Sequence, residues 1–165
     1  DEPAGSPAQA SDQWGDIARK NLLEALVKGL KRKKYDVRVA EVEKSGNPEL
    51  KEIQNLYRAV NKSIQLHTYG PQLFPGKVSH FDYSVGPTDV FLRQARADAI
   101  MLVNGLARIK PDGPKSYVSL GVAGPSGNII WYGMESSRGE HDLRDPEGAE
   151  MLVQGLLASF PSSGG

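Results

Sequence analysis

The sequence of 165 residues contains no cysteine, which excludes disulfide bonds, thiol catalysis and thiolate metal sites. It also lacks an excess of either charge, because 20 Lys and Arg residues balance 20 Asp and Glu residues. General nucleic-acid binding needs a basic excess, so a nucleic-acid partner is not expected. No apolar run approaches the roughly 18 residues of a membrane-spanning helix. The chain length and the hydrophobic fraction of 39% favour a single globular domain with its own core.

Motifs for common chemistry are missing as well. There is no Gly-x-Ser-x-Gly elbow for a hydrolytic serine. The glycine-rich run Gly121–Gly127 falls in an expected hairpin and lacks the Lys-Ser/Thr of a phosphate-binding loop. His67 and His80 are far apart in the sequence and have no nearby set of acidic ligands, so a metal site is not expected. The sequence therefore predicts no cofactor, no metal and no catalytic residue.

Residues 136–145 form the densest polar stretch, between the last expected strand and the last expected helix. Glu140, His141 and Asp142 could in principle support acid–base chemistry or bind a metal. Adjacent residues seldom converge on one point, so a polar rim for a protein partner is the favoured interpretation. The predicted partner-binding residues are Tyr117, Trp131, Arg138, Glu140, His141 and Arg144.

Apolar residues at spacings of three and four predict amphipathic helices. We expect about four of them, over residues 14–34, 48–67, 87–97 and 146–160. Asn47 and Asp145 are candidate N-caps, each followed by a proline that suits the first helical turn. The basic run Lys31–Lys34 falls at the end of the first helix, where cations oppose the helix dipole favourably.

Strands are expected at Asp98–Gly105, Tyr117–Ala123 and Asn128–Met134, and the turn residues between them predict an antiparallel meander. An earlier strand is predicted at Tyr35–Val42, where valines alternate with charged residues. Helices separate this strand from the meander, so it would join the sheet through a right-handed parallel crossover. The predicted fold class is α/β (α+β), with a mixed sheet of about four strands covered by about four helices.

The two faces of the meander differ in composition, because side chains alternate along a strand. On the middle strand, the apolar set Val118, Leu120 and Val122 is expected beneath helices. Less cover is expected for the opposite face, which consists of Tyr117, Gly121, Trp131 and Gly133. Core packing and a role as a binding anchor both remain open for Trp131.

The ends of the chain differ from its centre. Residues 1–13 are rich in Ala, Pro, Ser and Gly and predict a disordered tether, followed by one α/β domain over residues 14–161 and a flexible tail over residues 162–165. Such a tether suits a domain hung from a membrane anchor, and the corresponding expectation is a removed signal peptide that ends in a lipidated cysteine. A frayed terminus explains the same composition.

The run Ala97-Asp-Ala-Ile-Met-Leu-Val-Asn-Gly, a second strand, then Gly127-Asn-Ile-Ile-Trp-Tyr-Gly and a closing helix together resemble a group of bacterial envelope lipoproteins. The group includes CsgG-like proteins, LpoB-like activators of penicillin-binding proteins and the amino-terminal domain of TolB. In outline the resemblance covers residues 16–160. It implies a compact α/β domain with a periplasmic, outer-membrane-associated location and no chemistry of its own.

The leading functional prediction is a non-enzymatic accessory or scaffold domain that binds another envelope protein. Membrane contact would occur only through a removed amino-terminal lipid anchor. Whether the domain forms a homo-oligomer is left open by the sequence. The alternative is a small enzyme or ligand-binding domain that uses the loops 71–86 and 136–145 as the rim of its site.

Overall fold

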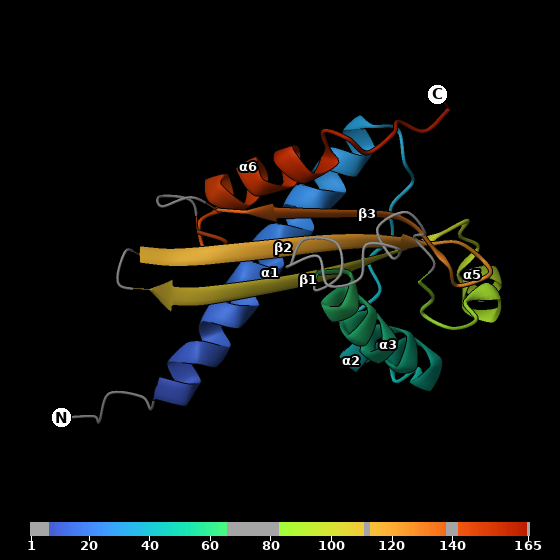
Figure 1. Cartoon of the computed structure of the whole chain (residues 1–165), viewed down its shortest axis with the longest axis horizontal. Helices are drawn as coiled ribbons and strands as arrows, with labels where there is room; N and C mark the ends of the chain where they lie inside the picture. Colours follow the sequence, from blue (N-terminus) through green and yellow to red (C-terminus); the bar gives the residue numbers. More distant parts are fainter. Residues whose placement is uncertain (1–6, 66–82, 111–112, 138–141, 165) are drawn as a thin grey trace. The chain divides into compact units, whose positions relative to one another are not determined.

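The computed structural model describes residues 7–65, 83–110, 113–137 and 142–164 (Figure 1), with the backbone alone for 7–14, 107–110 and 113–114. These residues form an α+β fold with five helices and a three-stranded antiparallel sheet. The sheet order is β1 (Ile100–Lys110), β2 (Gly113–Ala123) and β3 (Ile129–Ser136). The predicted antiparallel meander is therefore confirmed.

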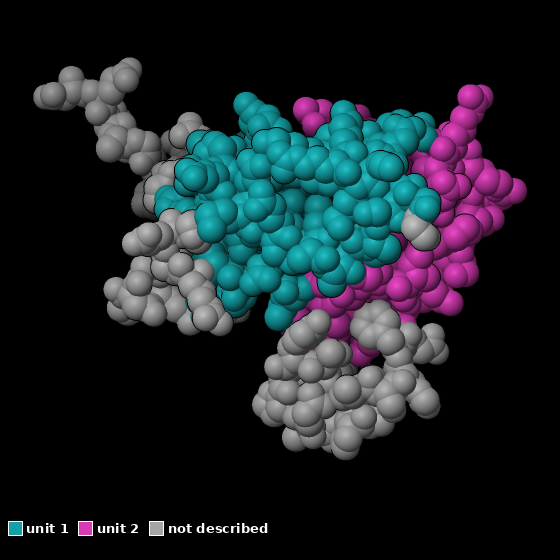
Figure 2. Space-filling view, turned by 90° about the horizontal axis from the view of Figure 1, so that it is seen from above, with its two compact units in different colours: residues 1–39, 105–118, 134–165 teal, residues 40–104, 119–133 magenta. Residues whose placement is uncertain are grey.

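The chain divides into two compact units (Figure 2), and each strand contributes residues to both. Unit 1 consists of residues 1–39, 105–118 and 134–165. Unit 2 consists of residues 40–104 and 119–133. We describe each unit by itself.

Helices α1 (Pro7–Arg32) and α6 (Pro146–Leu157) pack against each other in unit 1. Asp145 caps α6, because its side chain accepts a hydrogen bond from the backbone N–H of Glu147. The predicted apolar stripe of α6 is confirmed, since all its members are buried: Ala149, Leu152, Val153, Leu156, Leu157 and Phe160. Each buried leucine of such a stripe stabilises the fold by about 1.5–3 kcal/mol.

Helix α1 begins at Pro7, before the position near Trp14 that the apolar pattern predicts. Proline is favourable in a first helical turn, and the residues that follow it include alanines and glutamines with good helix propensity. Because none of these residues extends the apolar stripe, periodicity alone could not detect this part of the helix. Residues 1–6 of the expected tether lie outside the described residues.

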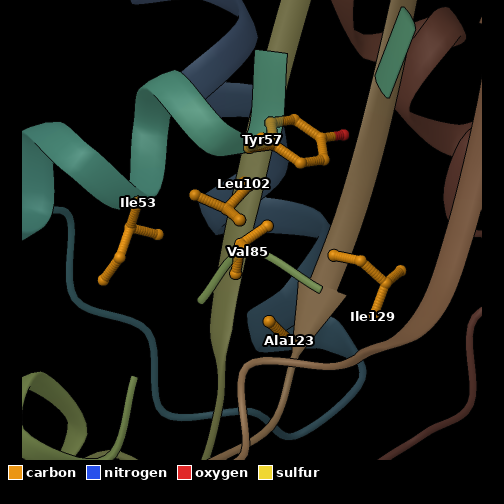
Figure 3. Packing of buried hydrophobic residues seen from close by; sticks show 6 residues of the cluster. All are labelled: Ile53, Tyr57, Val85, Leu102, Ala123 and Ile129. Atoms are coloured by element: carbon orange, nitrogen blue, oxygen red, sulfur yellow. The ribbon is translucent and has the colours of Figure 1, made fainter. Parts of the chain in front are cut away.

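Helix α3 (Pro48–Ile64) forms the predicted second helix and belongs to unit 2. The side chain of Asn47 accepts hydrogen bonds from the backbone N–H groups of Glu49 and Leu50, so this predicted cap is confirmed. One core cluster of unit 2 packs α3 onto the sheet (Figure 3); its buried members are Ile53, Tyr57, Val85, Leu102, Ala123 and Ile129.

Part of the sheet face for which we expected less cover is buried in unit 2, whereas Tyr117, Trp131 and Gly133 of that face are half-buried. The ring of Tyr57 lies directly over Gly121, where a Cβ atom would come within 2.5 Å of its Cε2 atom. Ser119 and Ala123, on the same face of β2, are also buried. The expectation was wrong for Gly121, because a glycine on a strand leaves room for an aromatic ring from elsewhere in the chain.

Residues 35–41 form no strand, and the short helix α2 (Val42–Ser45) follows them. The predicted strand at 35–42 is therefore wrong, because alternating valines and charges leave little apolar surface to hold an edge strand in place. Within the described ranges the sheet has three strands, so a fourth strand and a parallel crossover are not confirmed.

The remaining predicted helix corresponds to α5 (Asp89–Ala95), which starts later and ends earlier than expected. Leu92 is buried, whereas Val90 is exposed. Thr88 holds the N-cap position without a capping bond from its side chain. No helix among the described residues has the length and apolarity needed to cross a bilayer.

Candidate functional site

The predicted partner-binding residues do not form one group in the described chain. Arg138, Glu140 and His141 lie outside the described residues. Tyr117 is half-buried in unit 1, and the ammonium of Lys115 lies 5.5 Å from its ring centroid. The remaining two residues fall in different units, Arg144 in unit 1 and Trp131 in unit 2. Their joint role in partner binding stays a prediction.

Trp131 is half-buried on β3, and its indole lies along its own strand. A Cβ atom on Gly133 would come within 2.6 Å of the Trp131 Cη2 atom, so the ring covers this glycine. Side chains two residues apart share one face of a strand, which explains the contact. This arrangement gives Trp131 a packing role, and the choice between core residue and binding anchor stays open.

Arg144 fixes the chain just before α6. Its Nε atom donates a hydrogen bond to Oδ2 of Asp142 at 2.6 Å, and its backbone N–H donates to Oδ1 at 3.0 Å. The side-chain bond from Arg144 is the main cause that lowers the pKa of Asp142 below its ordinary value. Asn21 in α1 donates to the carbonyl oxygens of Leu143 and Arg144 at 3.1 and 2.9 Å. Arg144 therefore has an evident structural task.

Most of the predicted rim of an enzyme site lies outside the described ranges, namely residues 71–82 and 138–141. Within the ranges that the structure describes, no group of three or more His, Cys, Asp or Glu side chains could hold a metal ion. The enzyme alternative is thus neither supported nor tested by these loops.

A cluster of polar side chains lies in unit 2 between α3 and the sheet. The hydroxyl of Tyr132 donates to Oδ1 of Asn61 at 2.6 Å, and Nε2 of Gln65 donates to the same oxygen at 3.2 Å. The hydroxyls of Tyr57 and Ser119 are neighbours, but their geometry falls short of a hydrogen bond. Burial raises the pKa of Tyr57 and Ser119 offsets this rise only in part. Tyr57 therefore stays a neutral phenol near neutral pH.

A second region of unit 2 is held together by bonds between distant segments, and we call it the junction: segment Tyr83–Thr88 together with the β2–β3 turn Gly124–Ile129. Backbone hydrogen bonds join Val85 N–H to Gly127 O at 2.9 Å and Ile129 N–H to Tyr83 O at 2.8 Å. A side-chain bond adds to them, because Thr88 Oγ1 donates to Gly124 O at 2.5 Å. The turn is thus held from both sides by bonds to a segment distant in sequence.

Two glycines allow the backbones of the junction to approach closely. Gly127 has φ +83, and a Cβ atom there would lie 1.7 Å from the carbonyl oxygen of Gly86. Gly86 itself has φ +80, a conformation that side chains rarely adopt. Any other residue at position 127 would force the two segments apart, so this glycine determines the geometry of the junction.

Exposed apolar side chains surround the junction. Ile130 is 66% exposed, and its Cγ2 atom lies 4.0 Å from the Cβ position of Gly124. Leu56 is 39% exposed and contacts Gly86, where a Cβ atom would lie 3.1 Å from Leu56 Cδ1. Val90, which is 42% exposed, follows Thr88 by two residues. Large apolar side chains on a rigid backbone are typical of surfaces that contact another protein.

Sequence reasoning missed the junction, although two signals for it were present. Gly and Pro occur both at Gly86–Pro87, which predict a helix start, and at Gly124–Gly127, which predict a hairpin turn, and neither pattern alone indicates that the two segments meet. The consecutive residues Ile129 and Ile130 must also point to opposite faces of a strand. Since Ile129 is buried, Ile130 was the candidate for an exposed apolar residue.

No protein-family model, no curated protein and no solved structure matches this chain. The resemblance to envelope lipoproteins therefore stays a prediction that rests on the residues quoted for it.

Proposed function

We propose that this chain is a non-enzymatic binding domain that contacts a protein partner through the junction of unit 2. The observation that carries the proposal is the exposure of Ile130 beside a turn that is held by three hydrogen bonds. Covering a side chain of this size contributes about 1.5–3 kcal/mol to association. Val90, which follows Thr88 by two residues, would extend the same contact.

The rigidity of the junction supports this function. Binding through a mobile loop loses free energy because the loop must be ordered, whereas a preorganised turn avoids most of that cost. The bonds from Thr88 and Val85 hold the turn before any partner arrives. The apolar side chains therefore contribute to binding without a large entropic penalty.

The class of partner and the location belong to the same proposal. On the basis of the resemblance we propose another envelope protein as the partner and a periplasmic, outer-membrane-associated location. A second copy of the chain is the competing partner, because an exposed apolar surface serves self-association equally well.

Photo-crosslinking tests the proposed surface. A photoreactive amino acid is placed at Ile130 in the full chain, which is then irradiated in the cells that produce it. The matched control places the same group at Met151 of unit 1, which is 47% exposed. We expect a discrete protein adduct from position 130 and none from position 151. Equal adducts from both positions, or none from position 130, would contradict the proposal.

A further inference from the structure

Helices α1 and α6 of unit 1 (Figure 1) line a groove of about 210 Å3 between their side chains. Its lining is largely apolar, and the apolar residues come from both helices: Ala25, Gly29, Val153, Leu157 and Ala158. Leu157 packs directly onto Gly29, because a Cβ atom there would come within 2.7 Å of Leu157 Cδ1. The small volume suits a short segment and excludes a whole packed helix.

Basic side chains dominate the rim of this groove. Lys28, Arg32 and Lys33 line it from the α1 side, against the single carboxylate of Glu150 from α6. Glu150 Oε1 lies 3.0 Å from Lys28 Nζ and 3.6 Å from Arg32 Nη1. The Lys33 ammonium donates to the backbone oxygen of Phe160 at 2.7 Å, a neutral partner that leaves its charge in place. Among the described residues that line the groove, three cations stand against one anion, which gives this part of the rim an excess of positive charge.

The same end of α1 already holds a backbone segment without helix or strand structure. Ser163 N–H donates to the carbonyl oxygen of Lys33 at 2.9 Å, and the Tyr35 hydroxyl donates to Pro161 O at 3.0 Å. Together with the bond from Lys33, these contacts hold residues 160–163 against the end of the helix. This end of α1 thus offers both backbone hydrogen-bonding groups and side-chain cations, and a bound protein segment uses groups of both kinds.

We infer that this groove binds a short acidic segment of a protein, with an apolar side chain against Gly29 and Ala158, the apolar lining residues that are not buried, and a carboxylate paired with Arg32. The inference goes beyond the proposed function, since it concerns unit 1 and a different surface. Charge complementarity identifies the ligand class, because an apolar floor under a cationic rim matches an apolar side chain flanked by Asp or Glu. Glu150 occupies the cations in the unliganded chain and competes with the incoming carboxylate.

Peptide arrays and fluorescence anisotropy with the full chain test this inference. The probes are short peptides in which leucine or phenylalanine is flanked by Asp and Glu, each paired with its Asn and Gln counterpart. The tightest acidic probe is then titrated against three variants. Arg32→Gln removes a groove cation, Glu150→Gln removes the competing anion, and Arg19→Gln removes an exposed cation of α1 outside the groove lining.

We expect Arg32→Gln to weaken binding about fivefold and Glu150→Gln to strengthen it about threefold, as single exposed charge pairs allow. Arg19→Gln should leave the affinity unchanged. Equal binding of acidic and neutral probes would overturn the inference. So would equal losses in Arg19→Gln and Arg32→Gln, because attraction would then be unspecific. Arg32-dependent binding to phosphatidylglycerol vesicles without binding to any peptide would assign the groove to lipid instead.

Discussion

The hydroxyl of Tyr132 in β3 donates a hydrogen bond of 2.6 Å to the side-chain oxygen of Asn61 in α3. Asn61 is only 3% exposed, so water cannot replace this donor. The bond therefore ties a strand to the helix that covers it within unit 2. A buried acceptor that loses its donor costs more than the bond itself contributes, because the group stays desolvated.

Replacing Tyr132 with phenylalanine should destabilise the fold by about 1–2 kcal/mol, because Asn61 Oδ1 keeps only the longer bond from Gln65. Urea denaturation measures the change. Tyr117→Phe is the matched control, since this tyrosine is also half-buried and its known contact, with Lys115, uses the ring face. Equal losses in the two variants would show that the hydroxyl of Tyr132 has no special role.

Stability at alkaline pH should depend on Tyr57. Burial raises its pKa in the folded state above the ordinary value of 10.0, which applies to the unfolded chain. Below pH 10.0 both states keep the proton, so Tyr57 adds no pH dependence. Above it only the unfolded state releases the proton, and stability falls by up to about 1.4 kcal/mol per pH unit.

Tyr57→Phe removes this titration, so its free energy of unfolding should fall less steeply above pH 10.0 than that of the wild type. Urea midpoints measured across this range provide the comparison. The variant should keep its stability at neutral pH, since the Tyr57 hydroxyl makes no hydrogen bond within the described residues. Parallel slopes for the two proteins would mean that Tyr57 titrates normally and is not buried as described.

Gly127→Ala should be among the most damaging single substitutions. The new Cβ atom would lie 1.7 Å from Gly86 O, so the backbones of the junction must separate. We expect a loss of more than about 4 kcal/mol in urea denaturation. Gly46→Ala is the control, because Gly46 also has positive φ but nothing lies within 4 Å of its Cβ position. This control should lose only about 1–2 kcal/mol of backbone strain, and similar losses would refute the close approach.

Arg144→Gln should raise the pKa of Asp142 toward 3.8, its ordinary value, because the side-chain bond from Arg144 is the main cause of the lowered pKa. A group with a lowered folded pKa stabilises the fold above its unfolded pKa, and the contribution disappears as pH falls through the folded pKa. The wild type should therefore lose more stability on acidification than the variant does. NMR titration of the Asp142 carboxyl measures the shift. An unchanged pKa of Asp142 in Arg144→Gln would contradict the hydrogen bond from Arg144 as the main cause of the lowered pKa.

Local chemistry made several elements predictable from sequence. The apolar stripe of α6 and its Asp145 cap follow from residue spacing and from a side chain that bonds its own helix. The same holds for Asn47 at the start of α3. The three strands of the meander were recognisable because turn residues separate short apolar runs. In each case the deciding interactions lie within a few residues of one another.

Contacts between distant segments explain the errors. The ring of Tyr57 covers Gly121. The alternation of side chains along the strand predicts little cover for that face of the sheet. The junction depends on the approach of Gly86 to Gly127, which neither turn sequence reveals by itself. The candidate site follows the same rule. Trp131 and Tyr117 could be identified as unusual aromatic residues, but the exposure of Ile130 became evident only in the folded unit.

Competition for the partner tests the central claim most directly. A chain with a photoreactive group at Val90 is irradiated in an extract of the producing cells, and its adduct is titrated away with unlabelled competitors. Wild type and Met151→Ser should compete equally, because Met151 lies in unit 1. Ile130→Ser should need about tenfold more protein, as loss of a covered apolar side chain implies. If Ile130→Ser competes as well as the wild type, the junction of unit 2 is not the surface that binds the partner.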